Sequence, residues 1–185
     1  MNDISTVCSD LRKVADHANT TFGSLSAEQL NWKHAEKSWS VAQCFDHLIK
    51  VHSLYFPLFE RLASGDTKQN SWERMSPLSG FFGRYLIKSM RPENPKKMKT
   101  TPKAYPSASE IDGDIIERFA GHQNQMIASL QKLPANIDPA KQMITSPLLG
   151  VVTYSLDDTF TILVVHCQRH FLQAKRVTEN GGFPN

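Results

Sequence analysis

Four stretches of this chain place apolar residues three and four positions apart, which is the spacing of an amphipathic helix. They run over residues 3–22, 41–63, 107–130 and 156–179. Ser40 and Ser107 are each followed three residues later by Gln or Glu, a pattern typical of a helix start, and Pro57 predicts a kink or a break. Strand patterns are scarce. We therefore expect an all-α fold, a four-helix bundle formed by one domain over residues 1–185.

A long segment rich in proline, lysine and serine, residues 65–106, separates the second and third predicted helices. We expect it to be an insertion that covers the bundle, with one short helix at Leu78–Met90. From Arg84 to Lys103 it carries seven basic residues and one acidic residue, 7 − 1 = +6. Three interpretations stay open: a lid, a lid whose lysines attract an acidic substrate, or a binding module (78–103) for an anionic partner or membrane surface.

Composition argues against several classes of protein. A formal net charge of +3 gives little indication of nucleic-acid binding, and no run approaches the ~18 apolar residues of a membrane span. The three cysteines lack the spacing of a disulfide framework and the N-terminus does not resemble a signal peptide, so we expect a cytoplasmic protein. A chain of this length folds without a structural metal, so any metal ligands would reflect function.

The fourth predicted helix carries two histidines, His166 and His170, one turn apart on its apolar face. Side chains at this spacing have Cβ atoms about 5–6 Å apart, so both rings can bind one metal ion. A third ligand must come from another helix, and the candidates are His47, His122 and His52, in that order. The alternative, that these imidazoles are hydrogen-bonded core residues, stays open on spacing alone.

Two segments carry a family resemblance. "LNWKHAEKSWSVAQCFDHL" (30–48) and "SPLLGVVTYSLDDTFTILVVHCQRHFLQAKRV" (146–177) resemble the two signatures of the DinB-like (DinB/YfiT) superfamily. The first contains Leu-Asn-Trp, Trp-Ser and Asp-His-Leu; the second contains a Pro-x-x-Gly turn, then His-x-x-x-His and Gln. Many relatives have His-Pro where this chain has Ser146-Pro147, a difference that bears on the substrate.

The resemblance implies a four-helix bundle in which His47, His166 and His170 hold one divalent metal. It further implies an open coordination position that activates a low-molecular-weight thiol, as in S-transferases, or water, as in hydrolases, toward a small-molecule substrate. Imidazole ligands suit zinc or nickel, and also iron or copper. Relatives also make a homodimer an expectation, whereas no nucleic-acid partner and no membrane contact are expected.

Three further side chains are candidates for a pocket beside this metal. Gln173 lies one turn beyond His170, Cys44 lies one turn before His47, and His122 could reach the site from the third helix. Each has a structural alternative: a polar residue at the mouth of the bundle, a small buried thiol, and a core histidine.

Overall fold

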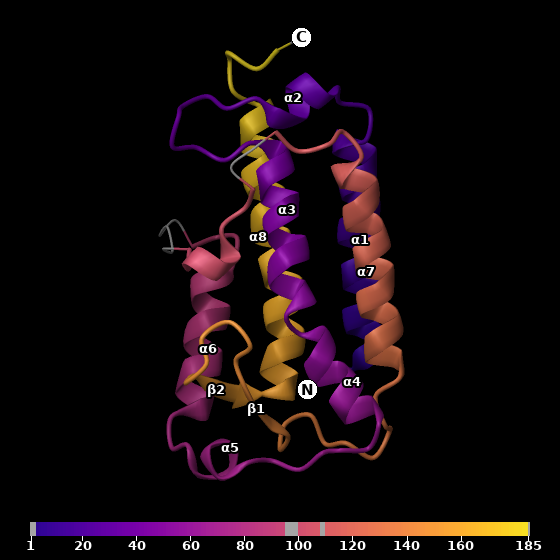
Figure 1. Cartoon of the computed structure of the whole chain (residues 1–185), viewed down its shortest axis with the longest axis vertical. Coiled ribbons are helices and arrows are strands. Elements are labelled where there is room, and N and C mark those ends of the chain that lie inside the picture. The colour runs from indigo at the N-terminus through magenta and orange to yellow at the C-terminus, as the bar shows by residue number, and fades with distance from the viewer. Residues whose placement is uncertain (1–2, 95–99, 108–109, 185) are drawn as a thin grey trace.

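The computed structural model of this chain describes residues 3–94, 100–107 and 110–184, and this part of the protein is mainly helical, as expected. Its long helices lie side by side along the molecule (Figure 1): α1 (Ile4–Phe22), α3 (Val41–Ser53), α7 (Ile115–Gln131) and α8 (Leu156–Thr178). Helix α1 packs against α7 and α8, and α3 packs against the same two helices. Among the described residues, no helix combines the length and the apolar character needed to cross a membrane.

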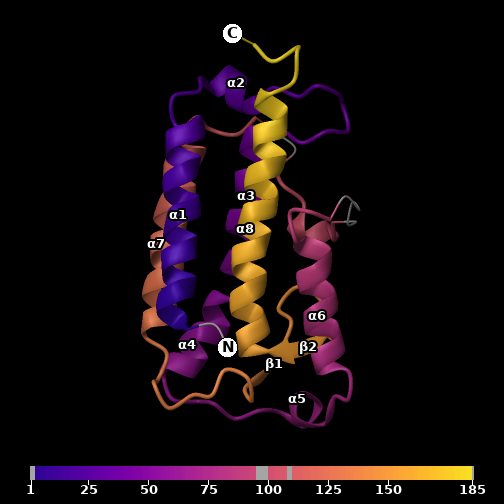
Figure 2. The ribbon, with the colours of Figure 1, turned by 180° about the vertical axis from the view of Figure 1, so that it is seen from behind.

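Shorter elements connect and cover these helices. They are α2 (Ala27–Asn31), α4 (Phe56–Ala63), α5 (Ser71–Met75), α6 (Ser79–Met90), the 3₁₀ helix η1 (Pro102–Ala104) and the antiparallel strands β1 (Met143–Thr145) and β2 (Thr153–Ser155). Seen from behind, α8 lies between α1 and α6 (Figure 2), and α6 packs against α8 and β2. The insertion therefore covers α8, and its expected short helix is confirmed by α6. Three lysines of the basic run, Lys96, Lys97 and Lys99, lie outside the described residues.

The core is formed by apolar side chains on the inward faces of the long helices and α4. Its largest fully buried side chains include Phe22, Phe45, Phe59, Phe119 and Phe160. The rings of Phe45 and Phe119 lie 4.9 Å apart, and such pairs contribute about 0.5–1.5 kcal/mol beyond the burial of their area. Because a helix turns about 100° per residue, this packing of Phe45 directs His47 to another face of α3, the face toward α8.

The second predicted helix is broken just before Pro57, as expected. Helix α3 ends at Ser53 and α4 begins at Phe56, with the proline in the first turn of α4. A proline is tolerated there because the N–H groups of a first turn have no partner within the helix. The expected start of α3 is also confirmed, since Ser40 Oγ accepts a hydrogen bond from the backbone N–H of Gln43 at 3.1 Å.

The predicted start of the third helix at Ser107 is wrong, because α7 begins only at Ile115. The backbone N–H of Ser107 donates instead to the Asp46 carboxylate on α3, at 2.7 Å. Farther along, the backbone of Ile111 exchanges two hydrogen bonds with the side chain of Asn31, at 2.8 and 3.0 Å. These bonds to other elements replace the helical ones, so this part of the chain runs across α2 and α3.

The hairpin of β1 and β2 was not predicted. Each strand has only three residues, too few for an alternating pattern to be recognised. Ile144 pairs with Tyr154, and the carboxylate of Glu73 in α5 accepts a hydrogen bond from the backbone N–H of Thr145 at 2.9 Å. The hairpin therefore ties the insertion to the start of α8.

Helix α6 approaches the first turn of α8 closely because Gly83 has no side chain. A Cβ atom at this position would overlap the carboxylate of Asp158. Asp158 also accepts a hydrogen bond from the backbone N–H of Ser155, at 3.3 Å, and so completes the capping box that begins α8. The insertion is thus docked against the helix that carries the histidine pair.

Candidate metal centre

The structure brings His47 of α3 beside His166 and His170 of α8. One nitrogen from each ring lies within 4.8 Å of the nitrogens of the other two. The ring centroids are 4.6–5.1 Å apart, and the planes of His166 and His170 are nearly perpendicular, at 80°. Three imidazoles from two helices therefore converge on one point, and His47 is the histidine ranked first among the candidates for the third position.

All three rings are buried, with exposed fractions of 5–7%. Burial holds the pKa of His166 and of His170 well below the usual histidine value, and the neighbouring imidazoles lower both further. Burial also lowers the pKa of His47, although the Ala104 carbonyl opposes this shift. The three rings are therefore neutral near pH 7, and each keeps a lone pair that can bind a metal.

The proton of His47 can be assigned from its hydrogen bond. Its Nδ1 lies 2.5 Å from the carbonyl oxygen of Ala104 in η1, and a carbonyl can only accept, so Nδ1 carries the proton. The lone pair of the neutral ring is then on Nε2, which lies 3.1 Å from Nε2 of His166. The insertion thus fixes the orientation of His47 through η1.

His170 supplies a test of whether a metal fits. Its Nδ1 is buried and has no hydrogen-bond partner among the described residues. Such a nitrogen is costly unless something binds it, and a neutral all-nitrogen set suits a divalent transition metal. Trp39 stacks on His170, with centroids 5.6 Å apart, and the nearby Gln173 side chain raises the pKa of His170, opposing the effect of burial. The residues present therefore fit the group that the spacing predicted, with Trp39 as a wall and Gln173 beside one ring.

Two candidates for the pocket lie elsewhere. Cys44 is fully buried in the apolar core, and burial raises the pKa of its thiol. Nε2 of His122 on α7 donates a hydrogen bond at 3.0 Å to Ser53 Oγ, whose own proton goes to the Ile49 carbonyl, and burial lowers the pKa of His122 to about 4. Neither belongs to the three-histidine group. Their positions agree with the alternatives given above, a small buried thiol for Cys44 and a core histidine for His122.

The sequence did not predict the roles of Trp39 and the Ala104 carbonyl at this site, and it suggested a different role for His52. His52, a candidate for the third ligand, lies behind His166 with its Nε2 3.2 Å from His166 Nδ1. Trp39 lies within the Trp-Ser motif, so a sequence signal for it existed. The Ala104 carbonyl has no such signal, because any residue offers a backbone carbonyl.

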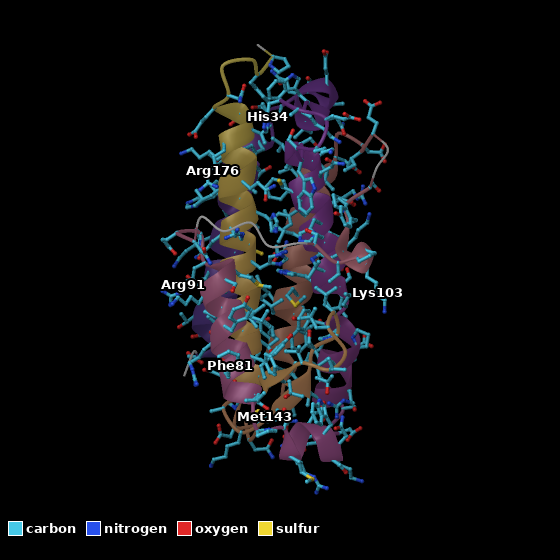
Figure 3. The ribbon with its side chains drawn as sticks, turned by 90° about the vertical axis from the view of Figure 1, so that its left-hand side faces the viewer. His34, Phe81, Arg91, Lys103, Met143 and Arg176 are labelled. Atoms are coloured by element: carbon cyan, nitrogen blue, oxygen red, sulfur yellow. The ribbon has the colours of Figure 1, made fainter. Side chains whose placement is uncertain are left out.

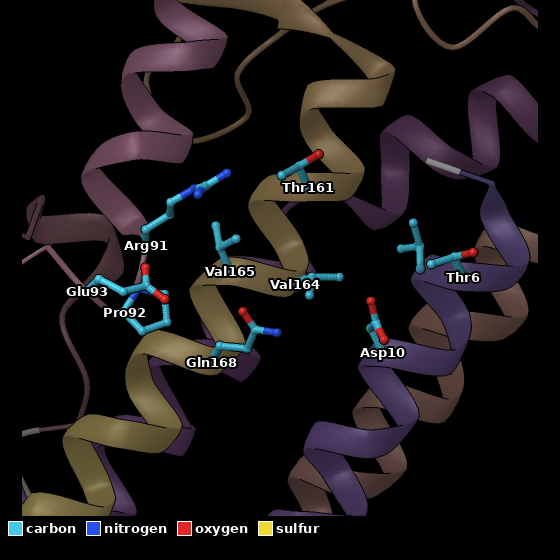
Figure 4. A pocket seen from close by; sticks show the side chains of 10 residues that line it. Thr6, Asp10, Arg91, Pro92, Glu93, Thr161, Val164, Val165 and Gln168 are labelled. Carbon is cyan, nitrogen blue, oxygen red and sulfur yellow. The ribbon is translucent and has the colours of Figure 1, made fainter. Parts of the chain in front are cut away.

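Two hollows lie near this region. One has a mostly apolar lining that includes His52, His166 and Ser146. Tyr55 and Tyr154 also line it, and their hydroxyl oxygens lie 2.8 Å apart. The other, of about 290 Å³, is a groove between α1, α8 and the residues after α6 (Figure 4), with Asp10, Arg91 and Gln168 among its lining residues. Gln168 follows His166 by two residues and so points to another side of α8. The groove is therefore separate from the histidine cluster.

A family model described as the DinB superfamily matches residues 10–174, which include all three clustered histidines. No curated protein and no solved structure matches the chain.

Proposed function

Because this chain belongs to the DinB superfamily, we propose that it is a metal-dependent enzyme in which His47, His166 and His170 hold one divalent metal. The observation that carries the proposal is the convergence of three buried, neutral imidazoles, with a nitrogen of each within 4.8 Å of the others. In this proposal α1, α3, α7 and α8 form the four-helix bundle of a single domain over residues 1–185.

Zinc or nickel is the preferred metal, and iron or copper also suits three imidazoles. When bound, such an ion supplies a Lewis acid with an open position, which lowers the pKa of a thiol or of water. We favour a low-molecular-weight thiol that attacks an electrophilic small molecule, as in an S-transferase, with metal-assisted hydrolysis as the second form. Neutral ligands suit either reaction, because they leave the charge of the ion uncompensated.

The protein's own side chains would hold and shield this chemistry. The Trp39 ring, 4.9 Å from His47 and stacked on His170, excludes water from one side of the site. Gln173 is partly exposed and lies near His170, so its amide can bind a polar group of a substrate. Ser146 lines the neighbouring apolar hollow where many relatives have histidine, and we expect it to alter substrate choice.

The first experiment measures the metal content of untagged protein, purified without chelator, by inductively coupled plasma mass spectrometry. The wild type is expected to contain close to one metal per chain, and a His47→Ala, His166→Ala, His170→Ala variant close to none, because the variant lacks every ligand of the site. A His17→Ala, His34→Ala variant is the control, since both of these histidines are exposed and should leave the content unchanged.

Absence of metal from the wild type, with none taken up when zinc or nickel is added, would make the three imidazoles core residues and end the proposal. If the metal is present, metal-loaded protein can be incubated with a low-molecular-weight thiol and an alkyl electrophile. Thiol-dependent product supports the transferase form, whereas turnover of an ester without thiol replaces it with the hydrolase form.

A second candidate function, contact with an anionic membrane surface or partner, is favoured by the outer face of α6. Phe81 and Tyr85 are 57% and 56% exposed, and their rings stack 6.2 Å apart. Arg84 and Lys88 are exposed on the same helix. Figure 3 shows this side of the molecule, with Phe81 on α6 and Arg91 beyond its other end. Exposed aromatic rings beside basic side chains are typical of helices that lie on anionic membranes.

Vesicle sedimentation tests this second candidate. Wild-type protein is expected to bind vesicles that contain anionic lipid and not neutral ones. Arg84→Glu, Lys88→Glu should weaken binding by more than about 30-fold, since the loss of each basic residue alone removes about 1 kcal/mol and the new carboxylates add repulsion. Lys33→Glu, Lys37→Glu is the matched control, because both of its lysines are exposed outside the insertion. No binding by the wild type, or equal loss in both variants, would contradict a membrane-binding role for α6.

A further inference from the structure

His166 is the one ligand candidate with imidazole neighbours at both of its nitrogens. Its Nε2 lies 3.1 Å from Nε2 of His47, on the side of the cluster. Its Nδ1 lies 3.2 Å from Nε2 of His52, on the side away from the cluster. His52 is 1% exposed, so water does not compete for this contact.

The contacts continue beyond His52 across the core. The Nδ1 atom of His52 lies 3.9 Å from Sγ of Cys167 on α8, and this sulfur lies 3.9 Å from Oε1 of Gln123 on α7. Cys167 and Gln123 are both 0% exposed. A buried chain of polar atoms therefore leads from His166 through His52 and Cys167 to Gln123, and it joins α3, α7 and α8.

The direction of the hydrogen bonds from His166 to Gln123 follows from the groups at the two ends of this series. A neutral imidazole has one proton, so His166 can offer an Nε2 lone pair to a metal only when its proton is on Nδ1. That proton needs an acceptor, and His52 Nε2 is in place to be one. The proton of His52 is then on Nδ1, directed at Cys167, whose S–H donates to the carbonyl oxygen of Gln123. Each link has one donor and one acceptor.

With the opposite tautomers the metal site would be blocked. If His52 Nε2 carried the proton, it would donate to Nδ1 of His166, and the proton of His166 would be on Nε2, facing His47. The atom needed for the metal would then be a donor without a lone pair. The group that faces Nδ1 of His166 therefore decides whether Nε2 of the same ring can bind a metal.

We propose that His52 is a positioning residue, which accepts the Nδ1 proton of His166 and so holds its Nε2 lone pair toward the metal, with Cys167 and Gln123 extending the chain. This inference rests on the proposed metal site. It assigns His52 a role other than that of a third ligand, which its spacing had also allowed, because the atom nearest the cluster is occupied by His166. It also explains a buried imidazole that an apolar side chain would otherwise replace at lower cost.

The test compares two amides that differ by one methylene group. The oxygen of His52→Gln can occupy the place of Nε2 and accept the proton of His166, whereas the side chain of His52→Asn reaches only to the place of Nδ1. Zinc affinity is measured by competition with a chromophoric chelator, and the visible spectrum of bound cobalt reports the coordination geometry. His122→Asn is the control, because it changes another buried histidine, one without a hydrogen bond to the cluster.

His52→Asn is expected to bind zinc about 10- to 100-fold more weakly than the wild type and to alter the cobalt spectrum, which is the usual effect of losing such a partner. His52→Gln and His122→Asn should stay within a few-fold of the wild type. Circular dichroism and thermal melting separate loss of fold from loss of affinity, since a merely structural role would lower the melting temperature without changing the spectrum of bound cobalt.

Two outcomes would overturn the inference, and they are distinguishable. If the wild type binds zinc and His52→Asn binds it equally well, His52 does not position His166, although the metal site stands. If the wild type binds neither zinc nor cobalt, the proposed function fails and the inference fails with it. Should His52→Asn not fold, the affinity of Cys167→Ala, expected to be several-fold weaker, decides the question in its place.

Discussion

Zinc added at about a thousand times its dissociation constant is expected to stabilise the wild-type protein by about 4 kcal/mol, because a ligand that binds only the folded state contributes RT ln(1 + [L]/Kd). Replacing His166 by alanine should reduce this gain to below about 1 kcal/mol. The ring contacts both other members of the cluster and shares the turn of α8 with His170. Urea unfolding with zinc and with a chelator measures both values.

A control is needed because removing any buried ring also destabilises the metal-free protein. His122→Ala is suitable: this histidine is 7% exposed, like those of the cluster, yet it lies outside the three-histidine group. The His122→Ala variant should be less stable than the wild type without zinc. Adding zinc should raise its free energy of unfolding by the same amount as in the wild type. Equal stabilisation of His166→Ala and the wild type would mean that zinc binds somewhere other than the cluster.

Acidification of the metal-free protein is expected to lower its free energy of unfolding by an amount similar to the gain from zinc. Burial lowers the pKa of His122 to about 4 and holds that of His52 well below the usual value of 6.5. Below pH 6.5 the unfolded chain therefore binds protons that the folded protein does not. Stability is then fully present above pH 6.5 and falls as the pH drops toward the folded-state values. For His122 alone the loss approaches about 3 kcal/mol near pH 4, since each pKa unit corresponds to about 1.4 kcal/mol.

Urea unfolding in the presence of chelator at pH 5, 6, 7 and 8 measures this dependence. The free energy of unfolding should change little from pH 8 to 7 and decrease steadily from 6.5 to 5. His122→Leu, which removes one of the titrating rings, should show a shallower decrease in the same range. A free energy that stays constant from pH 7 to 5 would mean that the buried histidines titrate alike in the folded and unfolded states.

Much of the fold follows from contacts between residues close in sequence. The hydrogen bond from Gln43 to Ser40 spans three residues, so the start of α3 could be predicted from a local motif. The break before Pro57 follows equally from local chemistry, because proline has no N–H to donate. The turn shared by His166 and His170 is also local, since residues four apart on a helix are neighbours in any fold.

The start of α7 could not be predicted in this way. Ser107 has a good local partner three residues ahead, and its backbone nevertheless bonds to Asp46, which is 61 residues distant in sequence. The short hairpin likewise depends on long-range contacts, because Glu73 and Thr145 come from segments 72 residues apart. Local propensity is a weak preference, and bonds formed in the folded state override it.

The sequence by itself determined the course of α1, α3 and α8 and which histidines share a turn, because both depend on spacing within one helix. Only the tertiary structure decided that His47 faces the pair on α8, that the Ala104 carbonyl fixes its proton, and that His52 lies behind His166. These contacts join residues 57 to 119 positions apart. They exist only when the core sets the rotation of α3 against α8, a result of packing that no local pattern records.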